Sequence, residues 1–391
     1  MRVCVVSYKE CWQDATGAWF SYGGFPAQMA AIASLFHETT LVIVQGAPRS
    51  GGIALPARAR VVPLRGPVGT DARRKLSVLA RLPYYLGAIA PHIHAADALH
   101  VPLPGDLPLL ALLVAFALGK RVIARYGGSW TSNGQTTLMN RVTRQCMRLL
   151  AGDRNVMLAA GEDDAPPASG MHWIFSTALT DAELHAIRPR LDRGLADTPN
   201  LVYVGRLSRE KGVAQLVQAV AQLWREGFGR LPRLTLIGDG PERAALERLV
   251  AAAGCDGTIE FVGQVDRATL SQHLLEADVC VQPSLTEGFC KAWLDALAHG
   301  VPVLGSPVGA APAVIGRAGE RGWLVPPGDA RALATALRRV LSTTADWPAL
   351  RARCRAYVEG RTLEAWAQLI RARCEQQWGA AVSLREQPVT R

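Results

Sequence analysis

The sequence has eight cysteines but no Cys-x-x-Cys pair, so it lacks the usual ligand pattern of a structural zinc site. The cysteines are scattered, and several fall in apolar runs, which is typical of reduced, buried thiols in a cytosol. The stretch 92–100 contains His92, His94 and His100, but no cysteine or carboxylate cluster completes a zinc-like set. The sequence therefore predicts neither a disulfide framework nor a bound metal ion.

Long hydrophobic runs are also missing. The longest, LPLLALLVAFALG at residues 107–119, is too short to cross a bilayer and is typical of a buried helix. The N-terminal MRVCVVSYKE is a short strand pattern, whereas a signal peptide would have a longer apolar region. We therefore expect a cytoplasmic protein, with peripheral contact at the inner face of the membrane as an alternative.

Lysine is scarce, at five residues, and the net charge of +10 comes mainly from arginine. The candidate partners are nucleic acid, an anionic membrane and a phosphorylated substrate. Nucleic acid is the least favoured, because no aromatic–basic recognition module is present. Residues 71–87 place Arg73, Arg74, Lys75 and Arg81 beside apolar side chains, which fits an anionic membrane surface or an ordinary amphipathic helix.

The chain has 391 residues, more than one ordinary hydrophobic core needs. Short β-branched runs alternate with helix-length segments, which predicts α/β domains with doubly wound, mainly parallel sheets. The alternation pauses in a proline-rich and charged region and restarts at residue 201. Strands are expected at 2–7, 41–44, 60–64, 92–95, 121–125 and 155–159, and again at 201–205, 234–237, 259–262, 278–281 and 301–304. Helices are expected at 25–36, 75–88, 107–118 and 138–150, and again at 212–226, 241–252, 267–275 and 289–299.

These patterns divide the chain into four parts. Residues 1–185 are expected to form the first domain, 186–200 a linker, 201–360 the second domain, and 361–391 a C-terminal helical segment.

Ligands of doubly wound sheets bind outside the carboxyl ends of the strands, so the loops there are the candidate site. In the first domain, Gly23 and Gly24 precede a helix, where glycine allows close backbone approach and the helix N-terminus favours an anion. Their spacing is not G-x-G-x-x-G, so the nicotinamide fingerprint is absent. A tight turn before a helix explains the pair equally well.

Two further loops follow strands of the second domain. In GRLSREKG (205–212), Arg206 and Lys211 flank a strand-to-helix loop, and two cations there suit a diphosphate. In GDGPERAAL (238–246), a turn at Gly240 leads into a helix with proline in its first turn. Solvated surface charge and simple turn chemistry are the alternative interpretations.

The stretch SLTEGFCKAWLDALAHGVPVLG (284–305) places two carboxylates eight positions apart. Gly288 allows an unusual backbone, and the following helix N-terminus offers free N–H groups to phosphate oxygens. At helical rise, Glu287 and Asp295 would lie about 12 Å apart, the scale of a bound nucleotide-sugar. For either acid alone, a favourable helix-dipole contact or plain solvent exposure is the simpler explanation.

Taken together, these motifs resemble the donor domain of the family 4 retaining glycosyltransferases, which have the GT-B architecture. That family has a Gly-Arg…Glu-Lys-Gly loop, a Gly-Asp-Gly-Pro loop, an E-x7-E helix and a Gly-Val-Pro-Val strand. The corresponding sequences here are GRLSREKG, GDGP, EGFCKAWLD and GVPVLGSPVGA, in the family's order. The match covers roughly residues 200–330 and extends loosely into the first half through YGGFPAQMAAIASLF and HIHAAD.

The resemblance implies two Rossmann-like domains facing across a cleft, with a C-terminal helix at 362–378 that crosses back to the first domain. It implies that Arg206 and Lys211 bind the donor diphosphate and stabilise its developing charge. Glu287 would hydrogen-bond the donor sugar, and Asp295 would take the ribose-binding position. The remaining donor-binding positions are Gly23, Gly24, Gly240, Gly288, Phe289 and Cys290.

The implied reaction transfers a sugar from a UDP- or GDP-sugar with retention at the anomeric carbon, without a metal or another cofactor. Two positions depart from the family pattern on the donor side. Asp295 stands where the family usually has Glu, and Cys290 stands where it has Gly.

A third departure concerns the acceptor side. The family often has a His after the fifth strand, where this sequence reads ARYGGSW with Gly127 in its place. Arg125, Tyr126 or His94 would then supply the missing group, so Arg125 and His94 are catalytic candidates. A packed strand-end role explains His94 equally well.

The acceptor is expected to bind the first domain, where the loop CWQDATGAWFSYGG is rich in aromatic residues. Bacterial polysaccharide or lipid-linked saccharide assembly is the first interpretation, and a small-molecule acceptor is the second. A nucleotide-sugar epimerase and a nucleotide-sugar-binding protein without catalysis are the remaining alternatives on this architecture.

Overall fold

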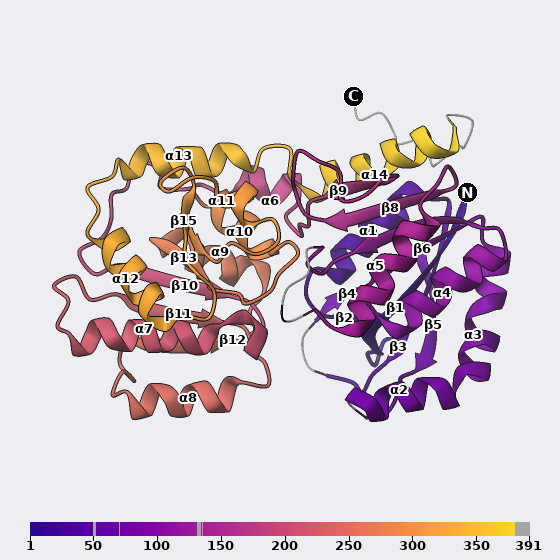
Figure 1. The fold of residues 1–391 in the computed structure, drawn as a ribbon, viewed down its shortest axis with the longest axis horizontal. Helices are drawn as coiled ribbons and strands as arrows, with labels where there is room; N and C mark the ends of the chain where they lie inside the picture. Colours follow the sequence, from indigo (N-terminus) through magenta and orange to yellow (C-terminus); the bar gives the residue numbers. More distant parts are fainter. Residues whose placement is uncertain (50–51, 70, 131–133, 135, 380–391) are drawn as a thin grey trace. The chain divides into compact units, whose positions relative to one another are not determined.

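The computed structural model describes residues 1–49, 52–69, 71–130, 134 and 136–379. Its internal contacts divide the chain into two compact units, drawn in Figure 1. Unit 1 comprises Met1–Trp130, Thr136–Ala178 and the segment from Leu363 onward, and unit 2 contains Leu179–Thr362. Residues 179–200, which the sequence divides between the first domain and a linker, thus group with unit 2.

A parallel sheet forms the centre of unit 1, with strand order β5-β3-β1-β6-β7-β8-β9. A short antiparallel pair, β2 and β4, continues from the end of β1. The central strands read as nearly unbroken apolar runs because both faces of the sheet are covered. The strands are β1 (Arg2–Gln13), β2 (Trp19–Ser21), β3 (Glu38–Gln45), β4 (Ile53–Ala54), β5 (Ala59–Arg65), β6 (Ala98–Leu103), β7 (Arg121–Tyr126), β8 (Asn155–Ala160) and β9 (Met171–Ile174).

Two hydrophobic clusters cover the two faces of this sheet. Helices α3 and α4 contribute to one cluster, and helices α1 and α14 contribute to the other. Trp366 of α14 is fully buried in the second cluster beside Met29 of α1, so the C-terminal helix (yellow in Figure 1) is part of unit 1. The helices of the unit are α1 (Phe25–Leu35), α2 (Asp71–Ala80), α3 (Leu82–Ala95), α4 (Asp106–Ala117), α5 (Leu138–Leu150) and α14 (Leu363–Trp378).

The predicted strand at 92–95 is wrong. These residues form the last turn of α3, which continues through Pro91, and the strand that follows is β6. The sequence His92-Ile93-His94 alternates polar and apolar residues as a strand does. However, Ile93 lies one helical turn after Ile89 and two turns after Tyr85. All three side chains are buried in one core cluster, so the periodicity is helical.

The aromatic loop expected at 11–24 is partly strand. β1 continues to Gln13, with a register shift between Ser7 and Glu10, and pairs there with β2. Trp12 is buried, with its ring centroid 4.5 Å from that of Tyr22 and 6.5 Å from that of Phe20. The Trp12 ring is therefore occupied by its own neighbours instead of being open to an acceptor.

Unit 2 has a sheet of six parallel strands in the order β12-β11-β10-β13-β14-β15. The strand order reverses between β10 and β13, and a ligand crevice is expected at such a switch point. The strands are β10 (Asn200–Val204), β11 (Arg233–Ile237), β12 (Ile259–Gly263), β13 (Val279–Gln282), β14 (Val303–Gly305) and β15 (Gly322–Leu324). The helices are α6 (Asp181–Ala186), α7 (Val213–Arg225), α8 (Arg243–Ala252), α9 (Arg267–Glu276), α10 (Lys291–Ala298), α11 (Ala311–Ile315), α12 (Ala330–Leu341) and α13 (Trp347–Tyr357).

Candidate functional site

The switch point of unit 2 brings two of the predicted loops together. β10 and β13 are direct neighbours, with Leu201 opposite Val279, so the loops that leave their carboxyl ends start side by side. The backbone N–H of Leu285 donates to the carbonyl of Glu210 at 2.8 Å. A Cβ added to Gly212 would lie 2.2 Å from the carbonyl oxygen of Pro283, so the two loops touch through their main chains.

Arg206 and Glu210 lie on the first of these loops. The side chain of Arg206 is 66% exposed and donates to Glu210 at 2.9 Å, and Ser208 Oγ donates to the same carboxylate at 2.7 Å. Partial burial alone would raise the pKa of Glu210, but these two donors lower it to about 2. Arg206 is thus a charged and accessible guanidinium held at the edge of the switch point.

Lys211 and Glu287 form an ion pair across the two loops. Their side chains are only 21% and 13% exposed, so water screens this pair less than it screens a surface pair. Burial would lower the pKa of Lys211, but the Glu287 carboxylate outweighs that effect and the pKa is raised. Lys211 is therefore a permanent cation beside a carboxylate at the place where the sequence predicts the diphosphate and the sugar.

The turn after Glu287 leads into α10 and is held by the backbone of a later loop. The N–H of Ala310 donates to the carbonyl of Gly288 at 2.9 Å. Gly309 has φ +56°, and a Cβ there would lie 2.3 Å from the carbonyl oxygens of both Glu287 and Gly288. Only glycine fits this position without moving the turn.

The first residues of α10 are buried against the turn. Cys290 is the N-cap of α10, and Phe289 lies 5.7 Å from Trp293 between ring centroids. Burial and the adjacent Glu287 raise the pKa of the Cys290 thiol to about 12. This thiol is therefore neutral near pH 7 and is not an activated nucleophile.

The loop after β11 packs on the loop after β10. The N–H of Leu207 donates to the carbonyl of Asp239 at 3.0 Å, and the N–H of Gly240 donates to the Asp239 carboxylate at 2.7 Å. A Cβ on Gly240 would lie 2.3 Å from the carbonyl oxygen of Leu207. Gly240 thus permits the close contact that fixes the Arg206 loop.

Asp295 lies in α10 and is already ion-paired. Its Oδ1 accepts a hydrogen bond of 2.8 Å from Arg267, the first residue of α9. Arg267 also donates to Glu183 of α6 at 2.9 Å. Arg267 is a residue that the sequence analysis missed, because no motif links it to a position 28 residues away.

The predicted residues of unit 1 lie in two places. Gly23 has φ +66°, and Gly24 is the N-cap of α1 and provides no side chain to cap it. Arg125 is the last residue but one of β7, directly before Tyr126, and is 8% exposed. Gly127 follows directly and donates its N–H to the carbonyl of Leu103.

Arg125 belongs to a buried polar cluster that the sequence did not reveal. Its Nη2 donates to Gln28 of α1 at 3.1 Å, and its guanidinium carbon lies 5.6 Å from the centroid of the Trp366 ring. His100 is fully buried nearby, and burial with the positive charge of Arg125 lowers its pKa to about 3. Among the described residues, Nε of Arg125, Nε2 of His100 and Nε1 of Trp366 have no hydrogen-bond partner.

His94 lies elsewhere. It is exposed in the last turn of α3, and its carbonyl accepts a hydrogen bond from Lys120, which precedes β7. That position is at the amino ends of β6 and β7, opposite the edge where a doubly wound sheet binds its ligand. A strand at 92–95 would bring His94 to the ligand-binding edge, but its position in α3 leaves it outside the site.

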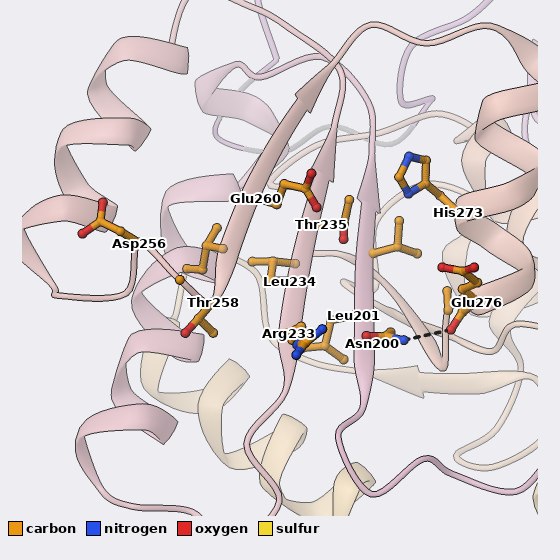
Figure 2. Close-up of a pocket in the computed structure, with 14 residues that line it drawn as sticks. Asn200, Leu201, Arg233, Leu234, Thr235, Asp256, Thr258, Glu260, His273 and Glu276 are labelled. Atoms are coloured by element: carbon orange, nitrogen blue, oxygen red, sulfur yellow. Dashed lines mark hydrogen bonds between the residues drawn. The ribbon is translucent and has the colours of Figure 1, made fainter.

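A separate hollow lies at the amino ends of β10, β11 and β12 (Figure 2). Charges of both signs line it, with Arg233 opposed by Asp256, Glu260 and Glu276. The side-chain amide of Asn200 donates to the carbonyl of Glu276 there, as the dashed line in Figure 2 marks. It is at the opposite edge of the sheet from the Lys211–Glu287 pair.

The described residues contain neither a metal-binding cluster nor a membrane-spanning helix. No group of three or more His, Cys, Asp or Glu side chains in the described ranges could hold a metal ion. No helix in the part of the chain that the structure describes is long and apolar enough to span a bilayer.

Comparisons with known proteins indicate the class of enzyme. The family model described as "Glycosyl transferases group 1" matches residues 198–343. Alpha-D-kanosaminyltransferase of Streptomyces kanamyceticus is 28% identical over 283 residues, which cover 68% of this chain and 70% of that protein. The chain is a glycosyltransferase. The amylovoran biosynthesis glycosyltransferase AmsK of Erwinia amylovora is 33% identical over 165 residues, which cover 41% of this glycosyltransferase and 40% of AmsK.

Solved structures show the fold of the glycosyltransferase. Sucrose-phosphate synthase of Thermosynechococcus elongatus superposes with a TM-score of 0.72 at 23% identity, covering 97% of this chain and 100% of that one. HepE of Anabaena, in complex with UDP and glucose, superposes with a TM-score of 0.69 at 17% identity, covering 95% and 98%. The predicted GT-B fold with two Rossmann-like α/β domains is therefore confirmed.

Proposed function

We propose that this glycosyltransferase is a retaining family 4 enzyme that moves a sugar from a UDP- or GDP-sugar to an acceptor hydroxyl. The observation that carries the proposal is the Lys211–Glu287 pair beside Arg206 at the switch point of unit 2. A nucleoside-diphosphate donor offers two phosphates for the cations and sugar hydroxyls for the carboxylate. The complex of HepE with UDP and glucose supports this class of donor, because that protein shares the fold.

In the proposed reaction, the acceptor oxygen attacks the anomeric carbon on the face that the diphosphate leaves. The bond between the anomeric carbon and the diphosphate oxygen breaks, and its electron pair stays on that oxygen, which then takes the acceptor proton. Lys211 and Arg206 stabilise the growing negative charge by Coulomb attraction in a partly dry site. These cations supply the charge in our scheme, and it contains no metal ion or other cofactor.

The neighbouring groups have assigned places in this scheme. Glu287 accepts hydrogen bonds from the donor sugar, and the N-terminus of α10 at Gly288, Phe289 and Cys290 faces the sugar and the phosphates. Gly240 keeps the Arg206 loop in position. The departure from the family glycine at Cys290 narrows this end of the pocket, since the thiol occupies space that a glycine leaves empty.

In unit 1, we assign Gly23 and Gly24 to donor binding and Arg125 to the acceptor. The N-terminus of α1 has no side-chain cap, so its N–H groups are available to oxygen atoms of a ligand. Arg125 is a buried guanidinium with no carboxylate partner among the described residues. A cation in that position suits an acceptor that carries oxygen-rich or anionic groups.

The acceptor that we propose is a growing polysaccharide or a lipid-linked saccharide. The name of AmsK places that relative in amylovoran biosynthesis. Helix α2 adds a surface for a membrane: Leu76 and Leu79 are 68% and 65% exposed, and Arg73 and Lys75 are exposed beside them. Apolar side chains flanked by cations fit the cytoplasmic face of an anionic membrane.

A small-molecule acceptor is the second candidate. It is favoured by the similarity to 2-deoxystreptamine glucosyltransferase of Streptomyces kanamyceticus, whose name gives a small molecule as the acceptor. Transfer assays with saccharide, lipid-linked and small-molecule acceptors decide between the two classes.

The central test is donor binding followed by product analysis. Thermal stabilisation by a panel of UDP- and GDP-sugars identifies the donor, because a ligand that binds only the folded state raises its melting temperature. NMR of the product from that donor then reads the anomeric configuration. Inversion would contradict a retaining mechanism, and isomerised donor without acceptor would identify an epimerase instead.

The membrane surface has its own test. Vesicles containing an anionic phospholipid should sediment the protein at low salt, and neutral vesicles should not. Charge reversal by R73E/K75E should abolish sedimentation. Failure of the unaltered protein to sediment with anionic vesicles would remove the membrane from the proposal.

A further inference from the structure

Arg267 joins three helices of unit 2 through two carboxylates. Its Nη1 lies 2.8 Å from Oδ1 of Asp295 in α10, and its Nε and Nη2 lie 2.9 Å and 3.4 Å from the carboxylate oxygens of Glu183 in α6. Arg267 itself starts α9 at the carboxyl end of β12. The guanidinium therefore lies at the ligand-binding edge of the sheet, and its hydrogen bonds to the two carboxylates fix its orientation.

The geometry at Asp295 leaves one oxygen for another ligand. Oδ1 accepts from Arg267, and Oδ2 accepts no hydrogen bond from the described residues. The carbonyl of Asp295 accepts from Nδ1 of His299 at 2.7 Å, and Nε2 of that ring lies 2.7 Å from Ser271 Oγ of α9. Both the side chain and the backbone of Asp295 are thus tied to α9.

The charges around Asp295 explain why two carboxylates share one arginine. If Arg267 faced Asp295 alone, the pair would be neutral and Asp295 would be a weak acceptor for a further hydrogen bond. Glu183 compensates the guanidinium from the other side, so the three groups together carry one negative charge. A carboxylate that keeps its charge accepts a stronger hydrogen bond from a hydroxyl.

We propose that Arg267 is a positioning residue that fixes the short Asp295 side chain. In this orientation, the free carboxylate oxygen of Asp295 accepts hydrogen bonds from the 2′- and 3′-hydroxyls of the donor ribose. The inference rests on the proposed function, in which Asp295 has the ribose-binding position. An aspartate reaches one methylene less far than the glutamate usual at this place. Holding the Asp295 side chain in one orientation compensates for this shorter reach, because the side chain then loses no rotamer freedom when the ribose binds.

The test compares nucleotides with and without the diol. UDP, GDP and their 2′,3′-dideoxy analogues are titrated by calorimetry into the full-length protein. The unaltered protein should prefer the ribose form by about 10- to 100-fold, the range expected for hydrogen bonds to a charged acceptor. Arg267→Met and Asp295→Asn should each reduce this preference to within about 3-fold, and combining them should reduce it no further.

Two milder variants keep the test valid if Arg267→Met does not fold. Glu183→Gln leaves Arg267 and Asp295 intact and should weaken the ribose preference by a few-fold, while Arg267→Lys should retain part of it. Arg338→Met is the matched control, since it breaks an exposed ion pair with Glu226 between α12 and α7. That control should keep the full preference for the diol.

The outcomes separate the inference from the proposed function. If the Arg267 variants weaken UDP and dideoxy-UDP, or GDP and dideoxy-GDP, by the same factor, Arg267 supports the fold or contacts the phosphates, and the inference is overturned. If the unaltered protein binds neither UDP nor GDP, the donor assignment itself fails. Loss of the ribose preference alone, with dideoxy binding retained, supports the inference.

Discussion

At the scale of single residues, burying the Lys211–Glu287 pair costs hydration free energy, while the two charges serve the proposed transfer reaction. Two charged groups that are mostly removed from water lose hydration, and their attraction repays it only while both are present. Removing one partner leaves the other charge buried and unpaired. Stability and catalysis should therefore respond differently when the pair is dissected.

The first prediction uses that difference. Lys211→Met should lower kcat by about 100- to 1,000-fold, because it removes a cation from the leaving diphosphate. It should also destabilise unit 2 by about 3 kcal/mol, and K211M/E287Q should recover most of this stability but none of the activity. Initial rates and urea unfolding measure the two effects.

Lys120→Met is the matched control for that experiment. Lys120 Nζ binds the carbonyls of His94 and Ala96 at the amino ends of the strands in unit 1. Its replacement should leave kcat unchanged. Full activity in Lys211→Met would remove Lys211 from the site.

A second residue-scale prediction concerns pH. The pKa of His100 is about 3 in the folded protein, below its ordinary value of 6.5, so the unfolded chain binds the proton more tightly. The stability that depends on neutral His100 is complete above pH 6.5 and is lost as the pH falls from 6.5 towards 3. The slope from this single group is about 1.4 kcal/mol per pH unit.

Urea unfolding at pH 7.0, 6.0 and 5.0 measures that slope. His100→Gln should make the pH dependence shallower, whereas His94→Gln, at an exposed position, should leave it unchanged. An identical slope in His100→Gln would show that His100 is not the responsible group.

At this scale, a contiguous motif predicts which residues lie close together in the fold. Arg206, Lys211 and Glu287 were chosen from short loops, and the structure brings them to one edge because their strands are neighbours. Arg267 and His100 were missed, since their partners come from distant elements. His94 was misplaced, because three residues cannot distinguish a strand from a final helical turn.

At the scale of elements, the glycines at strand-to-helix junctions set how closely the loops approach. Gly212, at the junction of β10 and α7, and Gly254, after the end of α8, both have φ +68°. Of the two, only Gly212 has a neighbour at the position of a Cβ, the carbonyl oxygen of Pro283 at 2.2 Å. The two positions form a matched pair. A substitution at Gly254 measures the cost of the left-handed backbone conformation alone, and a substitution at Gly212 adds the steric contact between the two loops.

The third prediction follows from that pair. Gly254→Ala should cost about 1 kcal/mol of unfolding free energy and leave transfer intact, because only the left-handed backbone is penalised. Gly212→Ala should cost clearly more and lower activity, because the added methyl group separates the two loops. Equal effects in the two variants would show that the loops have room to move apart.

The elements themselves were largely predictable. The segment 138–150 has a strongly periodic pattern, and the structure has a helix at Leu138–Leu150 as predicted. The predicted helix at 75–88 is instead two helices that meet at Arg81, with Pro83 in the first turn of the second. Short strands such as β9 were missed, because four residues after a proline-rich stretch give too little pattern.

At the scale of the whole molecule, the chain does not divide into consecutive halves. Unit 1 is completed by α14, whose Trp366 and Ile370 are fully buried in the cluster that contains β1 and α1. Residues more than 300 positions from the N-terminus thus hold the first sheet together. A substitution that weakens the packing of α14 should therefore destabilise unit 1.

The fourth prediction tests this with hydrogen exchange. Trp366→Ala should weaken unit 1 by about 3–5 kcal/mol, because a large buried ring is replaced by a cavity. Peptides of β1, β3 and α1 should exchange faster, while those of β10 and β13 keep their rates and their protection by the donor nucleotide. Trp224→Ala, at a side chain that is 38% exposed on α7, is the control and should change little.

Faster exchange throughout both units in Trp366→Ala would contradict the prediction. It would show that the units unfold as one cooperative body. Unchanged exchange in unit 1 would show that α14 contributes little to its stability.

The return of α14 to unit 1 also has a consequence for building chimeras between glycosyltransferases. A crossover near residue 179 alone would join a foreign tail to the sheet of unit 1 and leave the surface under Trp366 with the wrong partner. An exchange of donor specificity should instead transplant residues 179–362 as an insert and keep both flanking segments from the same parent.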